Sequence, residues 1–168
     1  IEHAYFEATG QYEPFAGICL VDTFETAELK TGSDQGVRQQ VGMEFFNHEN
    51  TIRVNRQNQT PIFVVKGNPP YNTNQADEND NNKNRKYPAI DGRIAATYAA
   101  DSKATLRNKL SDPYIKAIRW ASDRIGQEGI VALVTNSGFL DAIACDGMRK
   151  NLAEDFDAIY VLDLGGNV

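Results

Sequence analysis

The sequence predicts an α/β domain with a mostly parallel sheet, because short apolar runs alternate with amphipathic helical stretches. The apolar runs are about five residues long and lack polar alternation, which is typical of strands buried on both faces. The candidate strands are 17–21, 61–65, 130–134 and 158–162. Ligands of such sheets bind beyond the carboxyl ends of the strands, so we expect Asp22, residues 68–71 and Asn136 to share one edge.

Two helices are predicted between the later strands. Asp112 followed by Pro113 is typical of a helix start, since aspartate caps the first amides and proline fits the first helical position. Apolar residues then recur at helical spacing and predict one buried face, made of Tyr114, Ile118, Ala121 and Ile125. A second helix is predicted over about 146–155, and helix formers also fill residues 1–9.

Composition excludes several classes of protein. The chain has 168 residues, of which 41% are hydrophobic and 24% charged, as in an ordinary globular domain. It has no apolar run of about 18 residues and no signal-peptide pattern, so we expect no membrane span and a cytoplasmic location. Two cysteines are too few for a disulfide scaffold or a structural zinc site. We therefore expect no metal, and we expect Cys19 and Cys145 to be buried free thiols.

Charge is distributed unevenly along the chain, although the formal net charge is -6. Residues 1–60 carry a net charge of -5, residues 61–110 carry +3, and residues 111–168 carry -4. The acidic total argues against a nucleic-acid partner, but the basic middle segment provides a local surface for one. His3 and His48 are isolated from other ionisable motifs, and we expect neither to be catalytic.

The most distinctive motif is Asn68-Pro69-Pro70-Tyr71, directly after the candidate strand 61–65. Two prolines cannot continue the strand, so the motif forms a loop at its carboxyl end. A rigid turn without catalytic function is the simplest explanation. The motif also resembles the catalytic motif of amino-methyltransferases that use S-adenosylmethionine. In that family the asparagine oxygen and the next carbonyl accept hydrogen bonds from the target amine.

Longer stretches resemble the single-polypeptide type I (type ISP) restriction-modification enzymes. The matching stretches are 67–93, 112–124 and 135–141. The resemblance implies a partial Rossmann-like, S-adenosylmethionine-dependent methyltransferase fold that methylates the N6 amine of adenine in DNA. Residues 1–168 would be the C-terminal portion of the catalytic domain, with the first strands missing. The helicase-like ATPase, nuclease and target-recognition domains would lie outside them.

The resemblance also implies cofactor-binding residues. Val21-Asp22-Thr23-Phe24 resembles the acidic motif that binds the adenine of S-adenosylmethionine, so Asp22, Thr23 and Phe24 would hold the cofactor together with Asn68. Alternatively, Asp22 or Thr23 caps a helix. The family's glycine-rich cofactor loop is absent, so we expect this segment alone to form no continuous sheet and to bind the cofactor poorly. A dinucleotide-binding Rossmann domain is excluded because no G-x-G-x-x-G is present.

Four bases follow the motif and predict contacts with DNA phosphates, namely Lys83, Arg85, Lys86 and Arg93. Alternatively, they belong to a solvated loop. Double-stranded DNA would have to flip an adenine out of its stack to reach Asn68. The sequence is also compatible with two functions other than adenine methylation. One is methylation of another amine, on an RNA base or a protein glutamine, and the other is a non-catalytic DNA-binding remnant.

Overall fold

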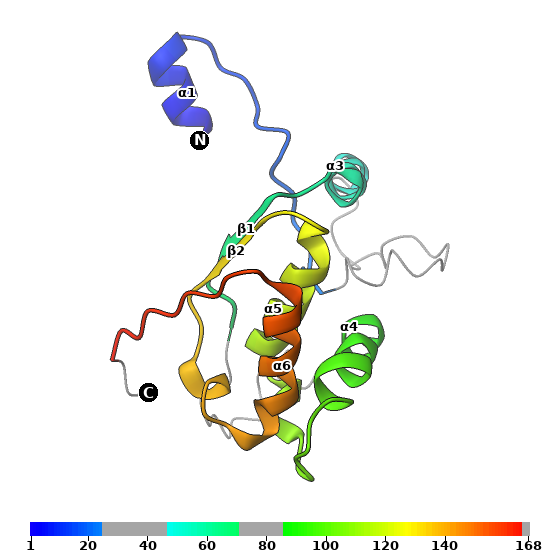
Figure 1. Ribbon diagram of the computed structural model, residues 1–168. Helices are drawn as coiled ribbons and strands as arrows, with labels where there is room; N and C mark the ends of the chain where they lie inside the picture. The colour runs from blue at the N-terminus through cyan, green and yellow to red at the C-terminus, as the bar shows by residue number, and fades with distance from the viewer. Residues whose placement is uncertain (25–46, 71–85, 166–168) are drawn as a thin grey trace, which may run out of the picture. The chain divides into compact units, whose positions relative to one another are not determined.

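The computed structural model describes residues 1–24, 47–70 and 86–165. They divide into two compact units, Ile1–Pro61 and Ile62–Val168 (Figure 1). The first unit contains helices α1 (Glu2–Thr9) and α3 (Asn47–Gln59). Gly10 ends α1 in the left-handed conformation, with φ of 70°, and its amide donates to the carbonyl of Phe6. The helix predicted over residues 1–9 is therefore confirmed.

The predicted strand 17–21 is wrong, because this segment is a loop that is bound to α3 by side chains. The side-chain amide of Asn50 accepts from the amide of Leu20 at 2.7 Å and donates to its carbonyl at 2.8 Å. The guanidinium of Arg53 donates to the carbonyl of Ile18 at 3.2 Å. These helix side chains satisfy main-chain groups that a neighbouring strand would otherwise pair, and Leu20 remains 76% exposed.

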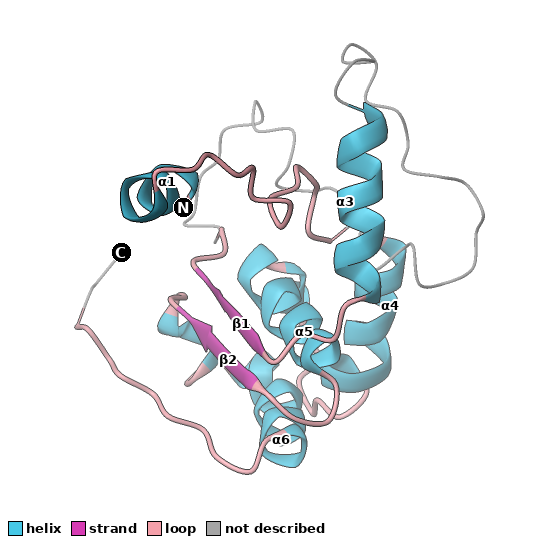
Figure 2. Ribbon diagram, turned by 90° about the horizontal axis from the view of Figure 1, so that it is seen from above, coloured by secondary structure: helices cyan, strands magenta, loops and turns pink. Residues whose placement is uncertain are grey.

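The second unit contains a two-stranded parallel sheet, with β1 at Val64–Gly67 and β2 at Ile130–Leu133 (Figure 2). Helix α5 (Pro113–Ile125) precedes β2 and packs against both strands. The order of strand, helices and neighbouring parallel strand is that of a βαβ connection. The strands predicted at 61–65 and 130–134 are thus confirmed, with β1 shifted toward the motif.

The remaining elements of this unit are short helices that surround α5. They are α4 (Pro88–Ile94), its π-helical continuation η2 (Ala95–Ala99), the 3-10 turns η3 (Asn108–Ser111), η4 (Ser137–Phe139) and η5 (Ile143–Cys145), and helix α6 (Asp146–Asp155). The start of α5 follows the prediction, because the carboxylate of Asp112 accepts from the amide of Tyr114 and proline follows the cap. The bounds of α6 agree with the predicted 146–155.

The core of the second unit lies among its helices. Its most buried side chains are Tyr98, Ile90, Ile115, Met148 and Cys145. The predicted face of α5 is largely confirmed, since Tyr114, Ile118 and Ala121 are buried. The strands are less buried than predicted: Val64 is 56% and Ile130 is 62% exposed. Among the described helices, α5 packs against both strands (Figure 2), and the parts of the sheet that it leaves uncovered stay exposed.

The fourth predicted strand, 158–162, is also wrong. This segment is an extended chain without strand pairing among the described residues. Tyr160 is 93% and Leu162 is 82% exposed. Its apolar pattern is that of a strand, but a strand needs a neighbouring edge to which its main-chain groups can bond. The described fold is therefore mixed α/β with a small parallel sheet.

Candidate functional site

The Asn-Pro-Pro motif lies where β1 ends. The strand stops at Gly67, so Asn68 and Pro69 are the first residues beyond it. The amide of Val134, just past β2, donates to the carbonyl of Gly67 over 2.9 Å. Because β1 and β2 are parallel, both strands end at the same side of the sheet, which we call the carboxyl edge. The chain therefore presents its motif where ligands of parallel sheets bind.

Asn68 is accessible at the carboxyl edge. Its side chain is exposed, Pro69 is half-buried and Pro70 is exposed. The two prolines restrict the backbone to a narrow range of φ, so this turn needs little reordering when a ligand binds. It carries two acceptor oxygens close together in sequence, on the Asn68 amide and on the Pro69 carbonyl. Tyr71, the last residue of the motif, lies outside the described residues.

Asn136 lies beyond β2 at the same edge, as predicted. Its side-chain oxygen accepts from the amide of Gly138 at 2.6 Å and caps η4. This oxygen is therefore engaged in shaping the loop after β2. The rings of Phe139 and Tyr114 lie 6.4 Å apart, and Tyr114 is buried at the start of α5. Asn136 thus orders the loop next to Asn68.

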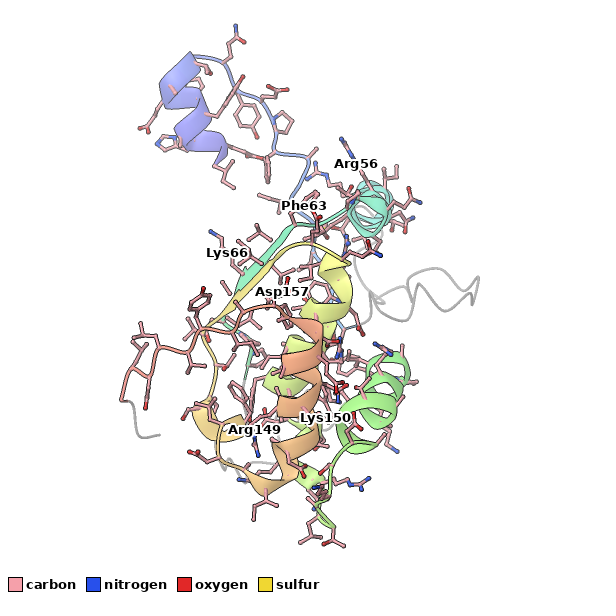
Figure 3. The ribbon with its side chains drawn as sticks, in the orientation of Figure 1. Arg56, Phe63, Lys66, Arg149, Lys150 and Asp157 are labelled. Carbon is pink, nitrogen blue, oxygen red and sulfur yellow. The ribbon has the colours of Figure 1, made fainter. Side chains whose placement is uncertain are left out.

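Arg149 holds the same loop from α6. One guanidinium nitrogen, Nη1, donates to the carbonyl of Phe139 at 2.8 Å and to that of Ala142 at 2.9 Å. Figure 3 shows this side chain reaching from α6 toward the loop after β2. The sequence did not predict this role. Its partners are main-chain carbonyls, which every residue has, so the residue types in the sequence do not indicate this contact.

Asp146 fastens the start of α6 to the chain that follows η2. Hydrogen bonds from the Ser102 side chain and the Lys103 amide lower the pKa of this carboxyl to about 2. The Lys103 amide lies 2.9 Å from Oδ2, and the Gly147 amide lies 2.7 Å from Oδ1. These donors favour the ionised carboxylate. They place residues 101–111 beside the N-terminus of α6.

The predicted cofactor residues Asp22, Thr23 and Phe24 belong to the first unit, whereas Asn68 belongs to the second. Asp22 Oδ1 accepts from the amide of Phe24 at 3.1 Å, and Phe24 is only 8% exposed. Thr23 is exposed and Asp22 is half-buried. A carboxylate and a hydroxyl on one short turn are suitable partners for an adenine amine and ribose hydroxyls. Their chemistry therefore fits S-adenosylmethionine. The alternative helix cap would involve residues beyond 24, which lie outside the described ranges.

The predicted DNA-binding bases fall into different surroundings. Lys83 and Arg85 lie outside the described residues, and Lys86 is exposed just before α4. Arg93 forms a two-point hydrogen bond to Asp123, with Nε at 2.9 Å and Nη2 at 2.8 Å from the carboxylate oxygens. The hydrogen bond with Asp123 raises the pKa of Arg93. Arg93 therefore links α4 to α5 and remains about half exposed.

Arg93 belongs to an ion-pair cluster, which we define as Arg93, Arg119, Asp123 and Asp155. Arg119 is buried and lies 2.8 Å from both Asp123 and Asp155. Burial alone would raise the pKa of Asp123, but hydrogen bonds and charge from Arg93 and Arg119 outweigh it and lower the pKa. The cluster joins α4, α5 and α6. No sequence pattern indicated it, since its members are up to 62 residues apart.

The cysteines and histidines considered in the sequence lie in different parts of the chain. Cys145 is a buried free thiol as predicted, whereas Cys19 is free but only partly buried and donates to Gln57. His3 is exposed and lies 3.2 Å from Glu7, and His48 lies on α3. The described ranges contain no group of three or more His, Cys, Asp or Glu that could hold a metal ion. Within the same ranges, none of the helices has the length and apolar character needed to cross a membrane.

The chain was compared with protein families, curated proteins and solved structures. No family model matches the chain, and no curated protein matches it. Solved structures match the chain over most of its length, and three of them are described here. The DrdV–DNA complex is 46% identical with a TM-score of 0.76, and covers 94% of this chain. A nuclease-deletion mutant of the type ISP restriction-modification enzyme LlaGI, bound to a DNA substrate mimic, is 38% identical with a TM-score of 0.77 over 94%.

The third structure is LlaBIII, an ATP-dependent type ISP restriction-modification enzyme bound to DNA. It is 37% identical with a TM-score of 0.75, over 90% of this chain. The chain spans only 14%, 12% and 10% of DrdV, LlaGI and LlaBIII, respectively. The carboxyl edge, its Asn-Pro-Pro turn and the helices around it thus belong to a chain that is similar, in sequence and fold, to one segment of type ISP restriction-modification enzymes.

Proposed function

We propose that this chain is part of a restriction-modification enzyme and methylates the N6 amine of adenine in DNA. One observation carries the proposal. An exposed asparagine and two prolines leave a parallel strand at the carboxyl edge, in a chain 37–46% identical to DNA-bound enzymes of restriction-modification. Both the position of the turn and its residue types match what amine methylation needs.

The chemistry assigned to Asn68 follows from the weakness of the nucleophile. The lone pair of the adenine amine is delocalised into the ring, so the planar amine attacks poorly. Two fixed acceptors, the Asn68 amide oxygen and the Pro69 carbonyl, would accept hydrogen bonds from the two amine hydrogens and favour a pyramidal nitrogen. Because the prolines fix the turn in advance, these acceptors need little reorganisation as charge develops. Tyr71 would stack on the base.

S-adenosylmethionine would supply the methyl group as an electrophilic sulfonium. We assign its binding to Asp22, Thr23 and Phe24, with Asn68 beside the reacting amine. The carboxylate of Asp22 would accept hydrogen bonds from the nucleoside part. The apolar ring of Phe24 is buried and would hold the turn that carries Asp22 in place.

We assign phosphate contacts to Lys83, Arg85, Lys86 and Arg93. Such contacts position DNA without reading its sequence and make affinity depend on salt. Of the two described residues, Lys86 is the simpler ligand because it is exposed at the start of α4. Arg93 uses two guanidinium nitrogens on Asp123, so we expect a smaller contribution from it.

The decisive test is Asn68→Ala in the full-length protein. We expect methyl transfer from labelled S-adenosylmethionine into DNA to fall by about 100-fold or more, because removal of one preorganised hydrogen-bonding group has this effect. DNA affinity should change by less than about twofold, since DNA binding depends mainly on phosphate contacts. Asn55→Ala, at an exposed asparagine on α3, is the matched control and should retain activity.

Full methylation by Asn68→Ala would refute the role of the motif. The same assay on RNA and on protein acceptors separates the rival substrates. If labelled methyl groups entered RNA or protein and not DNA, the substrate would be another amine and not adenine in DNA. DNA binding without label in any acceptor would support a non-catalytic remnant.

A further inference from the structure

We infer that residues 101–111, which we call the basic loop, form a second DNA-contact surface beside the carboxyl edge. This inference rests on the proposed function in taking DNA as the partner and, for Leu106, in taking adenine as the extruded base. It assigns the contact to a segment outside the motif and outside the bases that the sequence singled out. The argument comes from the position, charge, order and exposed leucine of the loop.

The position follows from packing. The basic loop connects η2 to α5, and its last residues form η3, which packs against η5. η5 belongs to the chain that continues from β2, so the loop reaches the side of the unit where β1 and β2 end. Figure 1 shows the loop at the same end of the unit as the N-termini of α5 and α6. DNA held at the carboxyl edge would therefore run close to it.

The charge of the loop is positive and faces solvent. Three exposed bases lie on it, namely Lys103, Arg107 and Lys109. Its one acid, Asp101, is already engaged, at 2.8 Å from both the Lys150 ammonium and the Asn151 amide. Within the described part of the chain, no carboxylate lies within ion-pair distance of the Lys103 or Lys109 ammonium. Unpaired ammonium groups on one loop suit the closely spaced phosphates of DNA.

The loop is ordered by its own hydrogen bonds. The guanidinium of Arg107 donates through Nε to the Ala104 carbonyl at 3.0 Å and through Nη2 to the Ser102 carbonyl at 3.1 Å. The Lys103 amide is tied to Asp146, and the Ala104 amide donates to the Ser102 hydroxyl. A loop ordered before binding loses little conformational entropy when it meets a partner. Arg107 thus shapes the loop, and the two lysines remain for phosphate.

Leu106 lies on this ordered loop and is 79% exposed. Ile143, on the neighbouring turn η5, is also 79% exposed. Apolar side chains flanked by bases are used by DNA-bending proteins as wedges that partly unstack base steps. Enzymes that act on a single base of a duplex must extrude it from the stack. We assign Lys103 and Lys109 to the phosphates and Leu106 to the base steps near the extruded adenine.

The first experiment measures how DNA affinity depends on salt. In the full-length protein, Lys103→Gln combined with Lys109→Gln should lower the slope of log affinity against log salt by about 2. Between about 50 and 200 mM salt, the loss of affinity should then be about tenfold smaller than in the unmodified protein. The matched control is Arg124→Gln, at the C-terminal end of α5. This helix is about 18 Å long and begins next to the basic loop, so the slope should not change in the control. An unchanged slope in the double variant would overturn the phosphate contacts.

A second measurement locates the contact without relying on methylation. Hydrogen exchange of peptides covering 101–111 should slow when a duplex of about 30 base pairs is added to the full-length protein. Leu106→Ser should keep this protection but weaken extrusion, seen as a smaller rise in the fluorescence of 2-aminopurine placed at methylatable adenines. Absence of protection, or protection by an acidic peptide and not by DNA, would overturn the surface. Protection of these peptides in an unmodified protein that methylates no DNA would instead leave the surface intact and refute the methylation proposal.

Discussion

The ion-pair cluster and the basic loop use the same kind of residue for different purposes. In the cluster, Arg93 and Arg119 are bound to carboxylates at 2.8 Å, and Arg119 is buried. In the basic loop, Lys103 and Lys109 are exposed and have no carboxylate partner within the described ranges. A base that is already paired holds the helices together. A base that is unpaired on an ordered loop is available to a partner.

This contrast has a direct consequence for sequence-based assignment of DNA contacts. Arg93 was singled out because it follows the motif in a basic segment, yet its guanidinium links α4 to α5. Lys103 and Lys109 lie in the same segment, and only the tertiary structure separates them from Arg93. Proximity in sequence therefore does not distinguish a base that is paired with a carboxylate from one that is not. The tertiary structure makes this distinction, because it shows which carboxylates surround each base.

The largest expected effect is on the cluster. Arg119→Met leaves Asp123 and Asp155 without their shared partner, and removal of one member of a buried ion pair costs about 3 kcal/mol or more. The two acids are about one-third exposed, so we expect a value near 3 kcal/mol. Hydrogen exchange of α5 peptides in the full-length protein measures it. Lys150→Met, at an exposed pair, should cost less than about 1 kcal/mol. Equal losses in the two variants would remove the distinction between structural and available bases.

A second prediction tests how closely α6 packs on η2. A β-carbon at Gly147 would overlap the carbonyl oxygen of Tyr98 and would lie 2.6 Å from the amide of Ser102. Both contacts are main-chain atoms that cannot turn aside, so Gly147→Ala should cost about 2 kcal/mol. Gly92→Ala in α4 is the control, because its β-carbon would meet open space, and it should stabilise the protein by up to about 1 kcal/mol. A neutral Gly147→Ala would mean that this packing is looser than described.

A third prediction concerns the loop after β2. Arg149→Lys keeps the charge but loses the planar guanidinium, whose Nη1 donates to the carbonyls of both Phe139 and Ala142. We expect a loss of about 1 kcal/mol, so the amides of Leu140 and Ala142 should exchange about fivefold faster. Methylation should fall through kcat with KM for DNA nearly unchanged, because the loop would position the site without touching phosphate. If exchange at these amides did not change, Arg149 would have no part in ordering the loop.

The smallest expected effect is the acid sensitivity of the start of α6. The pKa of Asp146 is lowered to about 2 from 3.8, so its ionised form stabilises the folded state at neutral pH. This contribution is present above pH of about 4 and is lost as pH falls toward 2. Asp146→Asn should therefore flatten the decline of stability over this range, followed by the fluorescence of Trp120. A decline of the same size in the variant would assign the acid sensitivity to other carboxyls, such as Asp123 or Asp101, whose pKa values are also lowered.

Local chemistry explains which elements were predictable. The start of α5 depends on Asp112 and Pro113, and the bounds of α6 depend on the nearby apolar pair Met148 and Leu152. Candidate strands 61–65 and 130–134 formed because each found the other as a parallel neighbour. Candidates 17–21 and 158–162 have the same apolar character but find no strand partner among the described residues. Helix α4 was missed, since its seven residues carry little periodic signal.

The sequence by itself determined the Asn-Pro-Pro turn, the cap of α5 and the order from β1 through α5 to β2. These features depend on residues within a few positions of one another, and their physics is local. Only the tertiary structure decided that Arg93 meets Asp123, that Arg149 meets two main-chain carbonyls and that Leu106 is exposed. Those outcomes depend on which distant surfaces come together. Residue type alone does not specify a partner 30 positions away or a bond to a backbone atom.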